Sequence, residues 1–290
     1  MSEQILDIAE LDVIYLSYDE PNAEKNYADI LTKVPWAKRI HGVEGSDAAH
    51  KACAEICETE RFITVDGDNI VQPEFINQTV NFVPGVDIKK NVISWTGYNV
   101  INGLMYGNGG IKCWDRQTVL EMKTHENADP DNKQAQVDFC WDLKYVQMNS
   151  CFSDVYNNGT PQQAWRAGFR EGVKMSLNRG AKVQDVANET WWQNYHRLLI
   201  WMNVGMDITN GEYAILGARE GCYKVLGTDW DHSQTRDFTI LNKLWEEKCF
   251  KESPAIERIT HLGQKLQAVS YTHLRAHETG RNLVCRLLLE

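Results

Sequence analysis

The sequence lacks a run of apolar residues long enough to cross a membrane, and its best apolar stretch is the short segment 198–202. It contains eight cysteines but no Cys-x-x-Cys pair, so a structural zinc site is not expected. The N-terminus has no basic and then apolar segment of the kind that directs secretion. These absences predict a cytoplasmic protein with reduced cysteines and no membrane contact.

Positive charge is also scarce, because 30 Lys and Arg residues face 40 Asp and Glu residues, for a net charge of −10 at pH 7. This balance argues against broad, nonspecific binding of nucleic acid, although it allows a local basic groove. The 290 residues, of which 43% are hydrophobic and 24% charged, suit one large soluble domain or two modest ones.

The most informative feature present is a short apolar strand, residues 61–65, that ends in Asp66-Gly67-Asp68. Its β-branched and aromatic residues are typical of a buried parallel strand. Both carboxylates then lie at the C-terminal edge of a sheet, where α/β proteins bind ligands. Hard oxygen ligands at such an edge suit Mg²⁺ or Mn²⁺ bound to a diphosphate. A solvated acidic turn after a strand is the alternative interpretation of the tripeptide alone.

The segments before this strand alternate between strand and helix patterns. Strands are expected at residues 12–18 and 37–43, and helices with one apolar face follow each of them. Cys53 and Cys57, one helical turn apart, are expected to be small core residues. This β-α-β-α-β order predicts a Rossmann-like α/β fold, with a mostly parallel sheet flanked by helices.

Beyond the Asp-Gly-Asp segment, a strand is expected at residues 91–100, followed by a glycine-dense loop at 107–110. This loop permits close approach to a ligand, but a plain hairpin turn is the alternative. The C-terminal half is expected to be helical, with helices at 163–177, 186–204, 211–219 and 237–250. Of the pair Trp191 and Trp192, at least one is expected in the core, and stacking on a base is the alternative.

Six segments together resemble the GT-A fold nucleotide-sugar glycosyltransferases, and more narrowly the phage-encoded proteins that modify 5-hydroxymethylpyrimidines in DNA. The matching segments are residues 12–21, 38–45, 62–68, 102–116, 165–171 and 211–214. The resemblance implies transfer of a hexose from a nucleotide-sugar, with a UDP-sugar as donor and 5-hydroxymethylcytosine in phage DNA as acceptor. It also implies a Mn²⁺ or Mg²⁺ cofactor and the cytoplasm of a phage-infected bacterial host as location.

The resemblance implies roles for individual residues. Asp66 and Asp68 would bind the metal, Asp66 also the donor, and Asp138 would deprotonate the acceptor hydroxyl. The other residues implied at the donor are Ser17, Tyr18, Glu20, Arg39, Gly45, Gly109 and Gly110. An acceptor that is a glycan, lipid or protein is the alternative, and a binding module without catalysis is a third possibility.

Several assignments remain open at the level of the sequence. Asp142 is an alternative to Asp138 as the catalytic base, because the two would share a face if residues 138–142 were helical. A reaction that retains the configuration of the sugar would need no base. His232 is offered as a third metal ligand, with a surface turn as the alternative. Arg166, Arg170 and Lys174 recur at helical spacing, so they are expected either to hold phosphates of the acceptor or to form a solvated face.

The expected organisation is a nucleotide-sugar-binding α/β half at residues 1–120, an acceptor-binding, helix-rich half at 121–250, and a tail at 251–290. Residues 269–290 resemble a translated sequencing adaptor that recurs on unrelated environmental sequences, which indicates a metagenomic source. A short amphipathic helix is the alternative for this stretch. The sequence does not specify the sugar, the stereochemical outcome or the oligomeric state.

Overall fold

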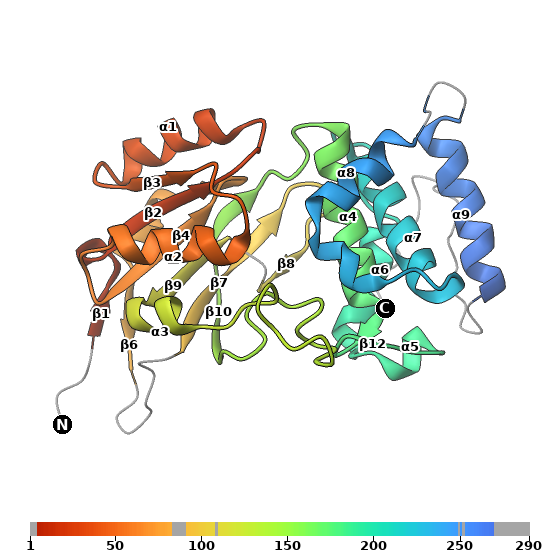
Figure 1. Ribbon diagram of the computed structural model, residues 1–290. Coiled ribbons are helices and arrows are strands. Elements are labelled where there is room, and N and C mark those ends of the chain that lie inside the picture. The colour runs from red at the N-terminus through yellow and green to blue at the C-terminus, as the bar shows by residue number, and fades with distance from the viewer. Residues whose placement is uncertain (1–4, 83–90, 108–109, 249, 251–252, 270–290) are drawn as a thin grey trace. The chain divides into compact units, whose positions relative to one another are not determined.

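The computed structural model describes residues 5–82, 91–107, 110–248, 250 and 253–269 (Figure 1). The chain forms two compact units, one of residues 1–128 and 139–156, the other of residues 129–138 and 157–290. We refer to them as unit 1 and unit 2. None of the described helices is both long enough and apolar enough to span a bilayer.

Unit 1 begins with the expected alternation of strands and helices, which confirms the β-α-β-α-β prediction. Its elements are β2 (Asp12–Ser17), α1 (Ala23–Lys33), β3 (Lys38–His41), α2 (Ser46–Ile56) and β4 (Arg61–Asp66). The three strands pair in parallel in the order β3-β2-β4. The carboxyl ends of β2, β3 and β4 therefore meet at one edge of the sheet.

The sheet as a whole is mixed, so the prediction of a mostly parallel sheet is wrong. Its order is β3-β2-β4-β9-β7-β10-β5, with β8 paired to β7. The added strands are β5 (Asn69–Val71), β7 (Val92–Asn99), β8 (Met105–Tyr106), β9 (Ile111–Asp115) and β10 (Tyr145–Val155), and β1 (Ile5–Asp7) pairs separately with β6 (Thr79–Asn81). β9 runs antiparallel to both β4 and β7, and β5 runs antiparallel to β10.

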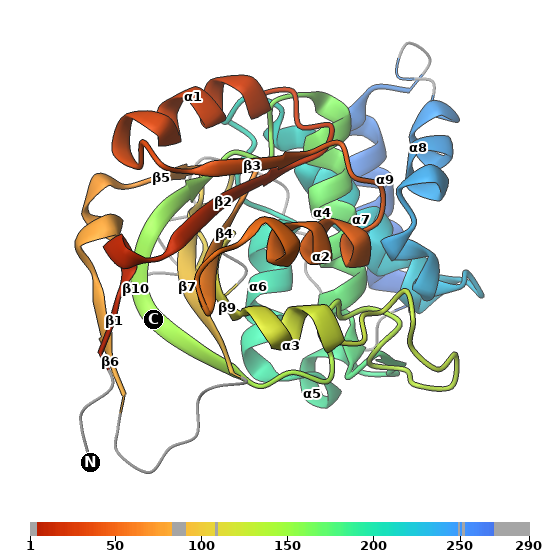
Figure 2. The ribbon, with the colours of Figure 1, turned by 60° about the vertical axis from the view of Figure 1, so that its left-hand side comes forward.

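The physical reason is that the described residues contain no α-helix between β4 and β9. Parallel neighbours need a connection of a dozen or more residues, whereas short turns return the chain antiparallel. The turn of residues 100–104 joins β7 to the antiparallel β8, and α3 (Arg116–Glu121) follows only after β9. β10 is long and strongly curved (Figure 2), and its pairing with β7 is irregular at Met148, Cys151 and Ser153.

Alternation along the strands divides the core of unit 1 between the two faces of the sheet. Val13, Tyr15, Ile63 and Val65 belong to one buried cluster together with Ile30 of α1. Ile14 and Phe62 belong to another cluster, with Cys53, Cys57, Trp114 and Val119 from α2 and its neighbours. The expectation that Cys53 and Cys57 are core residues is confirmed. Helix α1 therefore covers one face, and α2 and α3 cover the other (Figure 2).

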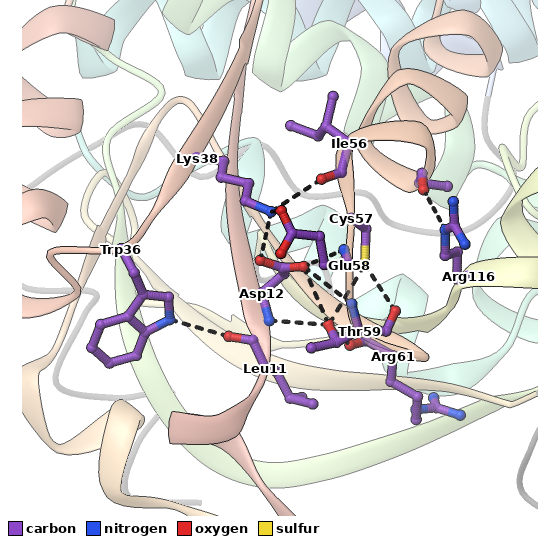
Figure 3. Close-up of polar contacts among 11 residues, drawn as sticks. Leu11, Asp12, Trp36, Lys38, Ile56, Cys57, Glu58, Thr59, Arg61 and Arg116 are labelled. Carbon is purple, nitrogen blue, oxygen red and sulfur yellow. Dashed lines mark hydrogen bonds and ion pairs between the residues drawn. The ribbon is translucent and has the colours of Figure 1, made fainter.

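Asp12 lies at the N-terminal end of β2, at the edge of the sheet away from the carboxyl ends of the parallel strands. Its side chain holds the turn that precedes β4 (Figure 3). One carboxylate oxygen accepts from the Glu58 amide at 2.5 Å and the Thr59 amide at 3.2 Å, and the other lies 2.9 Å from Lys38 Nζ. Burial raises the pKa of Asp12, but the hydrogen bonds from Glu58, Lys38 and Thr59 outweigh it and the net pKa lies below its ordinary value.

Substituting Asp12→Asn is expected to lower the free energy of unfolding by about 2 kcal/mol at pH 7, because buried amide donors lose a charged acceptor. Since the folded-state pKa is depressed, the carboxylate stabilises the fold above the unfolded pKa of about 4, and this contribution is lost as the pH falls. Urea unfolding of both proteins between pH 3 and 7 measures the difference. Glu58→Gln, at an 85% exposed side chain, is the control and should change little.

Unit 2 is helical and contains α4 (Pro161–Met175), α7 (Gly211–Gly227), α8 (Phe238–Glu246) and α9 (Ala255–Val269). Their shared core includes Trp165 and Phe169 of α4, Ile215 of α7, Leu241 of α8 and Ile259 of α9. Thus residues 255–269, within the expected tail, pack as a helix. Residues 270–290 lie outside the described residues, so their adaptor origin stays a prediction. The expected end of α7 at residue 219 is too early, because the helix continues with Cys222 and Val225 buried.

Helices α4 and α7 cross at backbone contact, through glycines on both sides. A Cβ added to Gly172 of α4 would lie 2.3 Å from the Ala218 carbonyl oxygen, and one added to Gly217 of α7 would lie 2.1 Å from the Trp165 carbonyl oxygen. Gly168 and Gly221 are equally confined. The crossing distance is therefore set by the absence of side chains at these positions.

The prediction of one long buried helix at residues 186–204 is wrong. Two helices occur instead, α5 (Val186–Glu189) and α6 (Trp192–Trp201). The break follows from Thr190, whose hydroxyl donates back to the Val186 carbonyl, and from the extended backbone of Trp191. Only Leu198 and Trp201 of α6 are buried. Trp191 and Trp192 are each 62% exposed, so the expectation that one of them is core is also wrong.

Candidate active site

The Asp-Gly-Asp segment leaves the end of β4 in a turn that is fixed through its central carbonyl. The Gly67 oxygen accepts from the Tyr15 hydroxyl at 2.6 Å and from Asn26 Nδ2 at 3.0 Å. A Cβ on Gly67 would lie 2.7 Å from a Glu20 carboxylate oxygen. Residues from β2 and α1 therefore orient the backbone between Asp66 and Asp68, and a side chain at position 67 would have to displace the Glu20 carboxylate and crowd Ser17.

Three carboxylates, Glu20, Asp66 and Asp68, share this end of the sheet. Burial, followed by the nearby charges of Asp66 and Glu20, raises the pKa of Asp68 to about 7. Burial also raises the pKa of Glu20, to which Asp66 contributes. Lys112 of β9 lies 3.9 Å from Asp66. The cluster holds more negative charge than its surroundings readily stabilise, which is the electrostatic condition that a divalent cation relieves.

The glycine-dense loop returns to the same place. The Asp66 amide donates to the Gly110 carbonyl at 2.9 Å, and the Gly110 amide donates to Asn69 Oδ1 at 3.3 Å. A Cβ on Gly110 would lie 2.7 Å from the Asp66 Cβ. Gly110 is thus brought against the Asp-Gly-Asp segment, while Gly109 lies outside the described residues.

Ser17 and Arg39 come together across the neighbouring strands β2 and β3. Arg39 Nε donates to the Ser17 hydroxyl at 3.2 Å, and its two terminal nitrogens bind the Glu24 carboxylate at 2.7 and 3.0 Å. The guanidinium also lies over the Tyr27 ring, 5.0 Å from its centroid. This arrangement presents a planar cation beside a buried hydroxyl at the edge where β2 and β3 end.

His41 belongs to this group, although the sequence interpretation did not include it. The Ser17 hydroxyl lies 2.9 Å from His41 Nδ1, and Arg39 donates to the same nitrogen at 3.1 Å. Because a guanidinium only donates, Nδ1 acts as an acceptor there. A signal was present, since alternation on a strand places Arg39 and His41 on one face, and the register sets His41 beside Ser17.

Tyr18 and Gly45 flank this edge more loosely. Tyr18 is 43% exposed, and its amide donates to Glu20 at 2.8 Å. Gly45 precedes α2, where the Glu126 carboxylate accepts from the Ser46 amide at 2.7 Å and from the Asp47 amide at 3.2 Å. The first turn of α2 is therefore capped by a residue far along the chain rather than by a neighbour in sequence.

The remaining sequence-predicted residues lie in unit 2. Asp138 is half-buried, and none of residues 137–142 is helical, so Asp138 does not share a helical face with Asp142, which belongs to unit 1. The Nε2 atom of His232 donates to the Gly180 carbonyl at 2.9 Å, and burial lowers the pKa of this imidazole. Among the described residues, no three His, Cys, Asp or Glu side chains form a metal-binding group, and this includes Glu20, Asp66 and Asp68 of unit 1. The roles of Asp138 and His232 stay predictions.

Arg166, Arg170 and Lys174 lie along α4, as the spacing predicts, but they are not an open solvated face. The Arg166 and Arg170 guanidinium carbons lie 4.3 and 5.2 Å from the centroid of the Phe238 ring, and Lys174 Nζ lies 3.9 Å from Glu171. All three side chains are half-buried. Their assignment to the acceptor stays a prediction.

No protein-family model matches the chain, and no curated protein matches it. Among solved structures, the chain is similar to one described as "crystal structure of a glycosyltransferase involved in the glycosylation of the major capsid of PBCV-1". The identity is 15% and the TM-score 0.26, over 48% of this chain and 82% of that chain. Similarity at this level carries no argument about the activity of this chain.

Proposed function

We propose that the chain is a metal-dependent glycosyltransferase that moves a hexose from a UDP-sugar to 5-hydroxymethylcytosine in phage DNA. The main support is the cluster of Asp66, Asp68 and Glu20 at the carboxyl end of β4, with the Gly110 backbone against it. Ligands of open α/β sheets bind at this end of parallel strands. Clustered carboxylates there suit a donor whose diphosphate arrives with a divalent cation.

Mn²⁺ or Mg²⁺ fits the chemistry of this donor set, because both prefer oxygen ligands and both stabilise the ionised carboxylate that burial, and then the charges of Asp66 and Glu20, disfavour at Asp68. Asp66 and Asp68 would hold the ion, and phosphate oxygens of the donor would supply further ligands. When bound, the cation neutralises charge that develops on the departing diphosphate. Ser17, Tyr18 and Arg39, at the adjacent strand ends, are proposed to contact the uridine of the donor.

The acceptor half of the proposal rests on unit 2. Asp138 is proposed as the base that takes the proton of the attacking hydroxyl. Arg166, Arg170 and Lys174 are proposed to bind DNA phosphates, and the exposed Trp191 and Trp192 offer rings on which an extruded base can stack. The net charge of −10 favours a second candidate, the same chemistry with a glycan, lipid or protein acceptor.

Incubating the protein with Mn²⁺, a panel of nucleotide-sugars and duplex DNA containing 5-hydroxymethylcytosine is expected to produce glycosylated nucleosides. Digestion to nucleosides followed by mass spectrometry measures the product. Unmodified DNA of the same sequence is the control and should acquire no sugar. Donor hydrolysis with no sugar-bearing nucleoside would instead support the second candidate, and absence of both would contradict the glycosyltransferase proposal.

A further inference from the structure

Side chains from α1, β2 and β3 of unit 1 form a chain of hydrogen bonds that ends at His41. The Glu24 carboxylate accepts from both terminal nitrogens of Arg39, at 2.7 and 3.0 Å, and Arg39 Nε donates to the Ser17 hydroxyl at 3.2 Å. The Ser17 hydroxyl and an Arg39 terminal nitrogen then lie 2.9 and 3.1 Å from His41 Nδ1. The imidazole is therefore held by partners that are themselves held.

The directions of these hydrogen bonds decide which nitrogen of His41 carries the ring hydrogen. A guanidinium can only donate, so Nδ1 accepts from Arg39. The Ser17 oxygen accepts from Arg39 Nε, which leaves its own hydrogen free to be donated to Nδ1 as well. Because both partners donate to Nδ1, the ring hydrogen lies on Nε2.

The Nε2 atom of His41 is accessible to a ligand. His41 is the exposed last residue of β3, and among the described residues none forms a hydrogen bond with Nε2. Tyr18, the residue that follows β2, is 43% exposed and offers a ring on which a planar group can stack. His41 therefore presents an oriented hydrogen-bond donor beside the residues that are proposed to contact the uridine.

We propose that His41 selects the nucleobase of the donor, by donating from Nε2 to the O4 carbonyl oxygen of uracil. This inference rests on the proposed function, because Ser17 and Arg39, which hold the imidazole, are the residues proposed to contact the uridine. The O4 atom lies on the edge of the base away from the ribose, where a side chain meets it without contacting the sugar. Cytosine has an amino group at this position, so two donors would meet with no acceptor between them.

Calorimetric titration of the full chain with UDP and with CDP, both in the presence of Mn²⁺, tests this proposal. The wild type is expected to bind UDP at least about tenfold more tightly, because the mismatched donors in the CDP complex are left without acceptors. His41→Gln should bind the two nucleotides within about twofold of each other, since its amide can turn to present either a donor or an acceptor. His261→Gln, at an exposed residue of α9 in unit 2, is the matched control and should keep the wild-type preference.

The position of the ring hydrogen is measured without any nucleotide. Long-range proton–nitrogen NMR spectra of the histidine-labelled protein should show it on Nε2 of His41, with the signal assigned by its loss in His41→Gln and circular dichroism confirming the fold of the variant. A hydrogen on Nδ1, equal affinity of the wild type for UDP and CDP, or an unchanged preference in His41→Gln overturns the role of His41. Sugar transfer that persists with any of these results leaves the proposed function standing, whereas a wild type that binds neither nucleotide and transfers no sugar contradicts both proposals.

Discussion

Replacing Asp68 by asparagine is expected to lower the rate of sugar transfer by at least about a thousandfold. The substitution keeps the shape of the side chain but removes a negative oxygen from the cluster with Asp66 and Glu20. Without it the proposed cation is held poorly, and charge on the departing diphosphate is no longer neutralised. Rates are measured by mass spectrometry of nucleosides, with Mn²⁺ at saturating concentration.

Asp68→Asn is expected to leave the stability of the metal-free protein unchanged or to increase it, although it lowers the rate of transfer. The raised pKa of Asp68 means that its ionised form opposes folding, so in the metal-free protein stability falls as the pH rises through about 7. The neutral amide removes this cost, and in EDTA at pH 8 the variant should melt at or above the temperature of the wild type. Added Mn²⁺ should stabilise the wild type and not the variant.

The combination of these two results separates a role in the reaction from a structural one. A residue needed only for packing would lose stability and activity together. Glu74→Gln, at an exposed acid in the 3-10 turn Pro73–Asn77 of the same unit, is the matched control and should leave both measurements unchanged. Wild-type rates in Asp68→Asn, or in the wild type with excess EDTA, would contradict the metal-dependent mechanism.

Substituting Gly172→Ala is expected to destabilise unit 2 by about 3 kcal/mol or more, which is large for a single added methyl group. The new Cβ would lie 2.3 Å from the Ala218 carbonyl oxygen and 2.9 Å from the Ala218 Cα. These are backbone atoms in the middle of α7, so no side chain can rotate away and the helices must separate. At an uncrowded helical site a Gly→Ala change would raise the free energy of unfolding by about 1 kcal/mol. Whether the variant is more or less stable than the wild type is therefore informative by itself.

Urea unfolding followed by tryptophan fluorescence measures this effect, because Trp165 belongs to the core of unit 2 and Trp230 and Trp245 pack against that core. Ala167→Ser, which adds one atom at a half-buried position of the same helix, is the control and should cost well under about 1 kcal/mol. Hydrogen exchange in unit 1 should be unaffected by either change. A stability of Gly172→Ala equal to that of the wild type would show that α4 and α7 do not cross at backbone contact.

Local patterns in the sequence determined the first part of the fold. Continuous apolar runs with β-branched and aromatic residues predict β2 and β4, which are buried on both faces. Apolar residues at helical spacing predict α1 and α2. The same reasoning places Asp66 and Asp68 directly after a buried strand. It also assigns Cys53 to the side of α2 that faces the sheet.

Local patterns do not specify pairing partners, because those depend on residues far apart in the chain. That Glu126 caps α2, that Gly110 lies against Asp66, and that Arg39 binds Glu24 are decided by contacts across 15 to 80 positions. The antiparallel course of β9 depends on short turns, and the crossing of α4 with α7 depends on complementary glycines. The sequence alone therefore determined the order of strands and helices as far as β4 and where the acids emerge. Only the tertiary structure decided which strands, helices and charges meet, since each such contact is chosen by the shape and charge of its distant partner.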